Sequence, residues 1–330
     1  MPAPVDRHVP VALGASSTAS DVLRDRDLRG TVAVVTGGTT GLGEETARAL
    51  AEAGATVAIT ARSAERARAT LRRIRRCKST ADLHWQRLDL MSLSSVREAG
   101  DALVRRFPDI DLLIANAGIM AGPLRRSVDG FEAQLATNHF AHFVLTARLF
   151  SSLVAGRGGR VIVTASSAHA YEGVHLDDLN YDRRRYEGFA AYGQSKTANI
   201  MFAAELDRRY RALGVRSASV HPGSIQTDLG RDLTSEDRDF LDLVLERVER
   251  PSWKTVEQGA ATQVWAAVAA DPVLIGGRYL EDCGIAAVNS DNAGLGPGIC
   301  PEAVEASTAA ALWDRSEQLT GEWYPESRRP

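Results

Sequence analysis

The sequence predicts an α/β protein, a single domain built around a doubly wound parallel sheet of about seven strands flanked by helices. The first observation is that short apolar runs alternate with longer amphipathic segments, which is typical of β-α-β units. The second is that these runs are apolar throughout, as expected of strands that helices cover on both faces. The third is that no repeat or clean linker divides the 330 residues, which favours one domain with appendages.

The elements follow in order along the chain. Strands are predicted at residues 31–36, 56–60, 83–88, 111–116, 160–165, 215–220 and 276–280. Helices are predicted at residues 43–54, 64–76, 92–107, about 130–154 and 196–214. In the second of these helices, Ala67, Leu71 and Ile74 recur at helical spacing and define its buried face. Crossovers between parallel strands are right-handed, so the units are expected to wind into one sheet.

The ends of the chain are expected to lie outside this domain. Residues 1–28 mix Pro, Ser, Asp and Arg without a sustained period and are interpreted as an N-terminal extension. The domain itself is assigned to residues 29–321, and residues 322–330 to a C-terminal tail.

Two segments of the domain are expected to frame a substrate pocket. Residues 168–191 form one of them, and residues 228–256 are predicted to be a lid containing one or two helices. Four apolar residues of this lid are expected to face inward: Phe240, Leu241, Val244 and Leu245. The charged composition of both segments identifies no substrate.

Composition excludes several classes of function. A net charge of −3 and a pI near 6.2 argue against a nucleic-acid surface. The three cysteines are far apart and form no CxxC pair, so neither a metal site nor a disulfide framework is expected. No apolar run approaches the roughly eighteen residues of a membrane span, and no secretory signal is expected from the N-terminal residues. A cytoplasmic protein is therefore expected.

The stretch TGGTTGLG, residues 36–43, lies between the first strand and the first helix. Glycines at positions 37, 41 and 43 allow the tight turn and close backbone approach that a pyrophosphate at a helix N-terminus requires. Its spacing differs from the G-x-G-x-x-G fingerprint, and an ordinary strand-to-helix turn also favours Gly and Thr. Its place after the first strand of a β-α-β series favours a nucleotide site.

The second strand indicates which dinucleotide binds. An acid at its end would suit the ribose hydroxyls of NAD, whereas an arginine suits the 2′-phosphate of NADP. The strand ends TVAITARS, with Arg62 and no carboxylate, so NADP is favoured over NAD.

The stretch AYGQSK contains one of only three lysines, which are Lys78, Lys196 and Lys254. Tyr192 and Lys196 are four residues apart, so on a helix they share a face. This spacing also occurs by chance in many helices, and the surrounding motifs must decide its meaning.

Taken together, the motifs resemble those of the short-chain dehydrogenase/reductase family, in particular its retinol-dehydrogenase-like branch. The matching stretches are TGGTTGLG, NAG (116–118), TNHFAHFVLT (137–146), RVIVTASSAHA (160–170), YGQSK (192–196), HPGSIQT (221–227), GGRYLEDC (276–283) and LWDRSEQLTG (312–321). They occur in the family's order, and the resemblance implies a Rossmann fold. It also implies a homodimer or homotetramer assembled through the two long helices.

The resemblance implies a catalytic tetrad of Asn138, Ser167, Tyr192 and Lys196, with Ser166 as the alternative serine. It also implies contacts to the cofactor from Gly37, Thr39, Thr40, Gly41, Leu42, Gly43, Arg62, Asp89, Leu90, Asn116, Ala117, Gly118, Tyr192, Lys196, Pro222, Gly223, Ile225 and Thr227.

The implied activity is an NADP-dependent interconversion of a ketone or aldehyde with an alcohol. Tyr192 would be the general acid and base, and the ammonium of Lys196 would lower its pKa. By resemblance, Asn138 would hold a water that links Lys196 to solvent. Alternative functions are action on C=C or C=N bonds, epimerisation, or cofactor sensing without catalysis.

Overall fold

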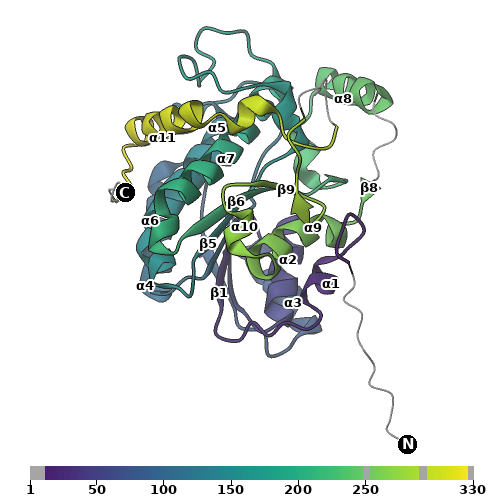
Figure 1. Cartoon of the computed structure of the whole chain (residues 1–330), viewed down its shortest axis with the longest axis vertical. Coiled ribbons are helices and arrows are strands. Elements are labelled where there is room, and N and C mark those ends of the chain that lie inside the picture. Colours follow the sequence, from purple (N-terminus) through teal and green to yellow (C-terminus); the bar gives the residue numbers. More distant parts are fainter. Residues whose placement is uncertain (1–11, 248–252, 290–295, 326–330) are drawn as a thin grey trace, which may run out of the picture.

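The computed structural model describes residues 12–247, 253–289 and 296–325 (Figure 1). Its central sheet has eight strands in the order β10-β9-β6-β5-β4-β1-β2-β3. The strands are β1 (Val32–Val35), β2 (Thr56–Ala61), β3 (Leu83–Arg87), β4 (Leu112–Ala115), β5 (Arg160–Thr164), β6 (Arg216–His221), β9 (Tyr279–Glu281) and β10 (Gly284–Ile285). All pairings are parallel except that between β9 and β10. The predicted fold class is confirmed, and the short β10 extends the sheet beyond the seven predicted strands.

Helices cover both faces of this sheet (Figure 1). The helices of the domain are α2 (Gly41–Glu52), α3 (Ala64–Cys77), α4 (Leu93–Arg106), α5 (Ala133–Leu135), α6 (Ala141–Ala155), α7 (Gly188–Tyr210), α8 (Ser235–Arg247), α9 (Val256–Val264), α10 (Pro272–Ile275) and α11 (Ala306–Thr320). Alternate residues of each strand enter opposite cores, as the pleat requires. In β1, Val34 packs into the core beneath α4, α6 and α7, whereas Ala33 and Val35 pack into the core beneath α2, α3 and α9.

The order of the strands reverses next to β1, which pairs with β2 on one side and β4 on the other. Such a switch point leaves a crevice at the carboxyl ends of the strands, where ligands of doubly wound sheets bind. The glycine-rich loop follows β1 and the NAG motif follows β4, so both lie at this crevice.

The N-terminal segment departs from the prediction. Residues 19–23 form a short helix, α1 (Ala19–Leu23), which begins with a capping box at Thr18. Ala19, Val22 and Leu23 are buried in the core that also contains α2 and α9. The described part of residues 1–28 is therefore not an extension outside the core, because α1 contributes apolar side chains that β-α-β periodicity could not reveal.

The C-terminal segment also reaches further into the fold than predicted. Trp313 of α11 is buried against Phe143 and Phe202, and Tyr324 packs on the same cluster. Glu322 forms ion pairs with arginines of α4 and α6. Residues 322–325 are thus part of the domain and not a tail, because they close the aromatic core over α6 and α7.

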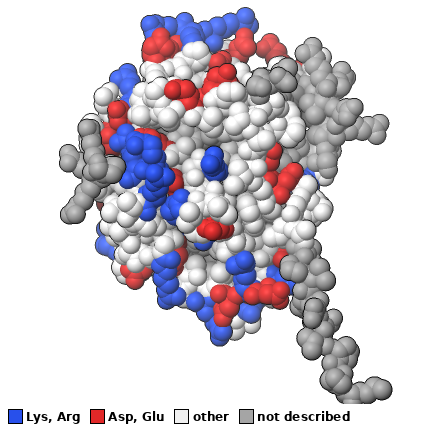
Figure 2. All heavy atoms as spheres, viewed as in Figure 1, with Lys and Arg blue, Asp and Glu red and all other residues white. Residues whose placement is uncertain are grey.

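On the face seen in Figure 2, basic and acidic side chains are interspersed, with uncharged areas between them. Across residues 12–247, 253–289 and 296–325, no helix has the length and apolar character needed to cross a membrane.

Candidate active site

The predicted cofactor residues all lie along the carboxyl edge of the sheet. Gly37, Thr39, Thr40, Gly41, Leu42 and Gly43 lie in the loop after β1 and the first turn of α2, Arg62 after β2, Asp89 and Leu90 after β3, and Asn116, Ala117 and Gly118 after β4. Pro222, Gly223, Ile225 and Thr227 follow β6. The topology therefore brings together residues that are far apart in the sequence.

The glycine-rich loop has the geometry of a phosphate cradle. Gly37 and Gly41 have φ values of 65° and 54°, a conformation that glycine adopts at little cost. A Cβ atom on Gly37 would lie 2.9 Å from the Cβ atom of Ala117, so the loop packs directly on the NAG segment. Thr40 caps α2 without a side-chain hydrogen bond, which leaves the N–H groups of the first turn available to an anion. These features fit the pyrophosphate of a dinucleotide.

An exposed arginine stands at the carboxyl end of β2. Arg62 follows the last residue of β2, and no acid stands in its place. Asp89 accepts a hydrogen bond from the backbone N–H of Met91 at 3.0 Å, which shapes the turn after β3. Within the described residues, no group of three His, Cys, Asp or Glu side chains could hold a metal ion.

Thr36 connects the glycine-rich loop to the NAG motif, although it is not among the site residues predicted from the sequence. Its Oγ1 accepts hydrogen bonds from the N–H groups of Asn116 and Ala117 at 2.9 and 3.0 Å. It also lies 2.9 Å from Nε2 of His142, while Nδ1 of that histidine lies 3.0 Å from the carbonyl oxygen of Asn138. Because a carbonyl only accepts, Nδ1 carries the proton and the Thr36 hydroxyl donates to Nε2.

His142 is held neutral in this position. Burial lowers its pKa to about 4. The hydrogen bond to the Asn138 carbonyl raises the pKa in part, and the nearby charge of Lys196 lowers it by a smaller amount. His142 and Thr36 therefore fix the helix that contains Asn138 relative to β1 and β4. The sequence signal that could have identified His142 is its spacing from Asn138, since the two residues are one helical turn apart.

Asn138 lies in η1 (Ala136–Phe140), a π-helical turn between α5 and α6. Its side-chain oxygen accepts from the N–H of Ile119, and its amide nitrogen donates to the Ile119 carbonyl and to the Ser195 hydroxyl, at 2.9 to 3.0 Å. Both amide hydrogens are therefore used in holding the loop after β4 against α7. A water bound at this residue would have to use its acceptor groups.

Tyr192 and Lys196 lie on one face of α7 at the inner end of the crevice. Both are buried, and Lys196 Nζ lies 5.4 Å from the centre of the Tyr192 ring. Nζ donates to the carbonyl of Thr164 at 3.0 Å, which places the ammonium at the end of β5. A Cβ atom on Gly193 would lie 2.8 Å from the Ala168 carbonyl oxygen, so only glycine lets the segment after β5 approach α7 this closely.

The pKa values differ from the expectation that Lys196 acidifies Tyr192. Burial raises the pKa of Tyr192 to about 12, although a hydrogen bond with the Ser166 side chain lowers it in part. Burial also lowers the pKa of Lys196 to about 7. Desolvation outweighs charge attraction here, because both groups are enclosed by protein.

Of the two adjacent serines, the structure brings Ser166 and not Ser167 to the phenol of Tyr192. Ser166 also accepts from the N–H of Ala168, and so caps the turn η2 (Ser167–Tyr171). The N–H of Ser167 instead donates to Nδ1 of His221 at 3.3 Å. The phenol's partner is thus the serine that was named as the alternative, and the choice of Ser167 as the catalytic serine stays a prediction.

The segment after β6 borders the same crevice. Thr227 Cγ2 would lie 3.5 Å from a Cβ atom on Gly41, so this segment reaches the glycine-rich loop. Gly259 of α9 packs against both Leu42 and Ile225, since a Cβ atom there would lie within 2.8 Å of each side chain. Predicted cofactor contacts from two separate motifs, the glycine-rich loop and the segment after β6, therefore lie close together.

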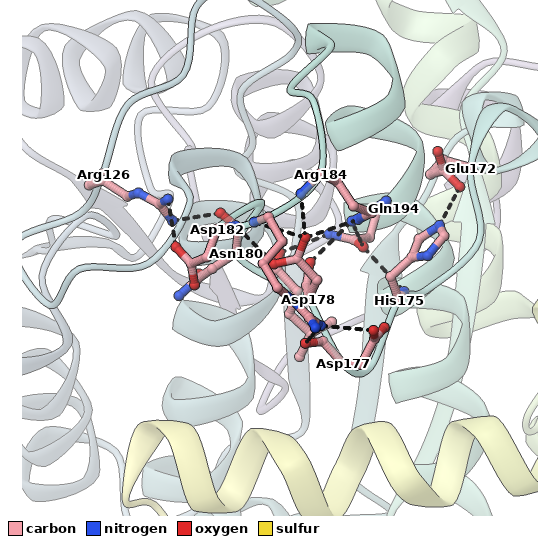
Figure 3. A network of polar contacts seen from close by, with 11 residues as sticks. Arg126, Glu172, His175, Asp177, Asp178, Asn180, Asp182, Arg184 and Gln194 are labelled. Carbon is pink, nitrogen blue, oxygen red and sulfur yellow. Dashed lines mark hydrogen bonds and ion pairs between the residues drawn. The ribbon is translucent and has the colours of Figure 1, made fainter.

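A polar network fixes the wall formed by residues 172–187 (Figure 3). Asp178 accepts from three backbone N–H groups further along this segment. Gln194 of α7 accepts from Arg184 at 2.9 Å and donates to a carbonyl of the segment at 3.0 Å. Gln194 is two residues after Tyr192 on α7, so its hydrogen bonds fix the position of the wall relative to the Tyr192 phenol.

The segment predicted to be a lid contacts the residues on either side of this wall through α8. Asp237 accepts from the N–H of Gly122 at 3.0 Å and, with Thr234, caps α8. Phe240 is 38% exposed, but its ring centre lies 5.6 Å from that of Tyr171 and 5.0 Å from that of Phe189.

The predicted inward face of the lid is thus only partly described. Phe240 contacts Tyr171 and Phe189, which flank the wall, and Leu241 is half-buried. The side chains of Val244 and Leu245 lie outside the described residues, as do residues 248–252 of the predicted lid.

Comparisons with known proteins agree with this geometry. A family model described as short chain dehydrogenase matches residues 31–238. Retinol dehydrogenase 13 of Homo sapiens is 33% identical over 327 residues, which cover 96% of each chain. The crystal structure of an uncharacterised protein from Mycobacterium paratuberculosis has a TM-score of 0.71 and 34% identity, and covers 94% of this chain and 99% of its own. That of a short chain dehydrogenase from Burkholderia cenocepacia in complex with NADP has a TM-score of 0.62 and 30% identity, covering 78% of this chain and 99% of its own.

Proposed function

This chain belongs to the short-chain dehydrogenase/reductase family, and on that premise we propose that it is an NADP-dependent enzyme interconverting a ketone or aldehyde with an alcohol. The observation that carries the proposal is the convergence of Tyr192, Lys196 and a serine hydroxyl in one buried cluster beside the glycine-rich loop. Its retinol-dehydrogenase-like relatives act on CH–OH or C=O groups, and the same cluster suits that chemistry.

Tyr192 is the proposed general acid for reduction and general base for oxidation. When bound, the nicotinamide would supply or accept the hydride. With a pKa raised to about 12 by burial, the phenol is protonated at neutral pH and ready to donate to a developing alkoxide. The Ser166 hydroxyl already bonds the phenol, and it is the proposed donor to the substrate oxygen as negative charge develops.

Lys196 is proposed to bind the cofactor ribose and to assist proton movement at Tyr192. Its Nζ donates to Thr164 at the end of β5, which leaves two further N–H groups to donate. Asn138 is proposed as a positioning residue, because its amide hydrogens hold Ile119 and Ser195. The exposed Arg62 supports NADP over NAD, since an arginine directly after the second strand suits a 2′-phosphate.

The proposed partner is a small carbonyl or alcohol substrate, and the proposed location is the cytoplasm. Among the described residues, Cys77, Cys283 and Cys300 form no disulfide, which is consistent with a reducing compartment. A homodimer or homotetramer would have to accommodate α11, because Trp313 covers part of the aromatic faces of α6 and α7.

The proposal is tested by turnover of NADPH with a panel of ketones and aldehydes, with product analysis to separate reduction of C=O from that of C=C or C=N. Tyr192→Phe should bind NADPH but lose at least about 100-fold in kcat, because the proton donor is gone. Full turnover by this folded variant would refute the mechanism.

A matched pair of variants distinguishes the two serines. Ser166→Ala should lower kcat by about 100-fold, whereas Ser167→Ala should retain kcat within about threefold. The reverse ranking would restore Ser167 to the catalytic position.

A further inference from the structure

The third lysine of the chain has a position as specific as that of Lys196. Lys78 is an exposed residue at the end of α3. Lys254, by contrast, lies in β8 (Trp253–Lys254), which pairs in parallel with β7 (Ser224–Ile225) at the base of the lid. In this register Lys254 stands opposite Ile225, one of the residues that border the crevice.

The side chain of Lys254 lies directly over Gly223. A Cβ atom on that glycine would come within 2.8 Å of Cδ, 3.0 Å of Cε and 3.3 Å of Nζ of the lysine. Gly223 also has a φ of 94°, which a larger residue would adopt only with strain. The aliphatic stem of Lys254 therefore occupies the space that a side chain at position 223 would need.

Asp282 holds the ammonium group of Lys254 through an ion pair. The lysine side chain is only 9% exposed, whereas that of Asp282 is 51% exposed, so the cation is largely withdrawn from water. Asp282 and Cys283 form the turn between β9 and β10, with φ values of 51° and 56°. Two consecutive non-glycine residues in this region are costly, and such strain persists where the surrounding structure fixes it.

His221, the first residue of the segment 221–225, contacts the turn that contains Ser167. Its Nδ1 accepts from the N–H of Ser167, so this nitrogen must be unprotonated. Burial, followed by the charge of Lys254, lowers the pKa of His221 to about 4, which keeps the ring neutral. Asp282, Lys254 and His221 thus connect the β9–β10 turn to the turn that carries the serines.

We propose that Lys254 is a positioning residue that clamps residues 221–225 to the β9–β10 turn and thereby preforms the nicotinamide side of the cofactor cleft. The inference rests on the proposed function in one respect, since it takes this segment to border the nicotinamide. Lys254 acts through the backbone of this segment and takes no part in proton transfer. Its loss therefore affects cofactor affinity and the order of the segment, and leaves the chemical step largely intact.

The test compares Lys254→Met, Asp282→Asn and the double variant with wild type, and uses Lys78→Met as the matched lysine control. The dissociation constant of NADPH is measured by fluorescence titration, and kcat is measured at saturating NADPH. Each single variant should weaken NADPH binding by about tenfold, because an ion pair withdrawn from water is broken. The double variant should bind no more weakly than the singles, and kcat should stay within about threefold.

Hydrogen exchange of the protein without cofactor provides the second measurement. Lys254→Met and Asp282→Asn should accelerate exchange in residues 221–227 and at the amide of Ser167, and Lys78→Met should not. Asp282 is half-exposed, so Asp282→Asn keeps the test valid even if Lys254→Met fails to fold.

Three outcomes would overturn the proposal: unchanged NADPH affinity in both single variants, additive losses in the double variant, or unchanged exchange in residues 221–227. Failure of wild type to bind NADPH would instead refute the proposed function, and exchange alone would then decide whether Lys254 is a clamp.

Discussion

Lys196 shows how strongly burial acts on a single residue of this site. Its Nζ has one protein acceptor, the Thr164 carbonyl, which also accepts from Asn199. Its pKa is lowered by burial from 10.5 to about 7, so folding disfavours the charged form. In the folded state the residue binds a proton only below about pH 7, whereas in the unfolded chain it does so up to its ordinary pKa. Because the unfolded state holds more protons between these values, this residue makes stability rise with pH.

We therefore predict that Lys196→Met raises the Tm of the protein without cofactor, and more at pH 6 than at pH 9. The two gains should differ by roughly 3 °C or more, since the charged lysine is costly at the lower pH. Thermal denaturation followed by circular dichroism measures this, with the exposed Lys78→Met as control. A gain in Tm that is the same at both pH values would contradict the assigned pKa.

At the scale of elements, Thr36 joins three parts of the fold. Thr36 directly follows β1. Its hydroxyl accepts hydrogen bonds from two N–H groups after β4 and donates one to His142, which lies on the helix that continues from η1. The π-helical turn places the Asn138 carbonyl where His142 can donate to it. Such turns are frequent at functional sites, and here one helix is adjusted so that Asn138 reaches both Ile119 and Ser195.

Thr36→Val should lower the free energy of unfolding by about 2 to 4 kcal/mol, because it leaves two buried N–H groups and His142 without their partner. Thr36→Ser keeps the hydroxyl and should cost no more than about 1 kcal/mol. Urea denaturation measures both variants. A Thr36→Val variant as stable as Thr36→Ser would contradict the role assigned to these hydrogen bonds.

At the scale of the whole molecule, both ends of the chain close over opposite faces of the α/β unit. The helix α1 packs beside α9, and α11 packs on α7 with Trp313 inside an aromatic cluster (Figure 1). This cluster includes Phe143, Phe202, Tyr210 and Tyr324, with ring centres 4.5 to 6.0 Å from that of Trp313. Residues outside the β-α-β pattern therefore complete the core.

Trp313→Ala should lower the free energy of unfolding by about 3 to 5 kcal/mol, as expected for removal of a fully buried indole. The matched control is Trp323→Ala, because Trp323 is 65% exposed and its loss should change stability by no more than about 0.5 kcal/mol. Chemical denaturation compares the two variants. If Trp313→Ala were as stable as its control, α11 would not be an integral part of the fold.

The sequence by itself determined the features that depend on neighbours along the chain. Apolar runs separated by amphipathic segments define a parallel sheet, the glycines after β1 define the phosphate loop, and the i, i+4 spacing places Tyr192 and Lys196 on one helical face. Each of these follows from local periodicity or backbone freedom, and each was predicted.

Only the tertiary structure decided which groups meet and in what environment. Ser166 and Ser167 are adjacent and chemically identical in the sequence. In the fold, Ser166 caps the turn after β5 and bonds the phenol of Tyr192. The pKa values of Tyr192 and Lys196 are set by burial, which depends on elements distant in the sequence. The ion pair between Lys254 and Asp282 also depends on tertiary structure. Sequence periodicity indicates the helix or strand to which a side chain belongs, whereas long-range packing determines which side chain it contacts.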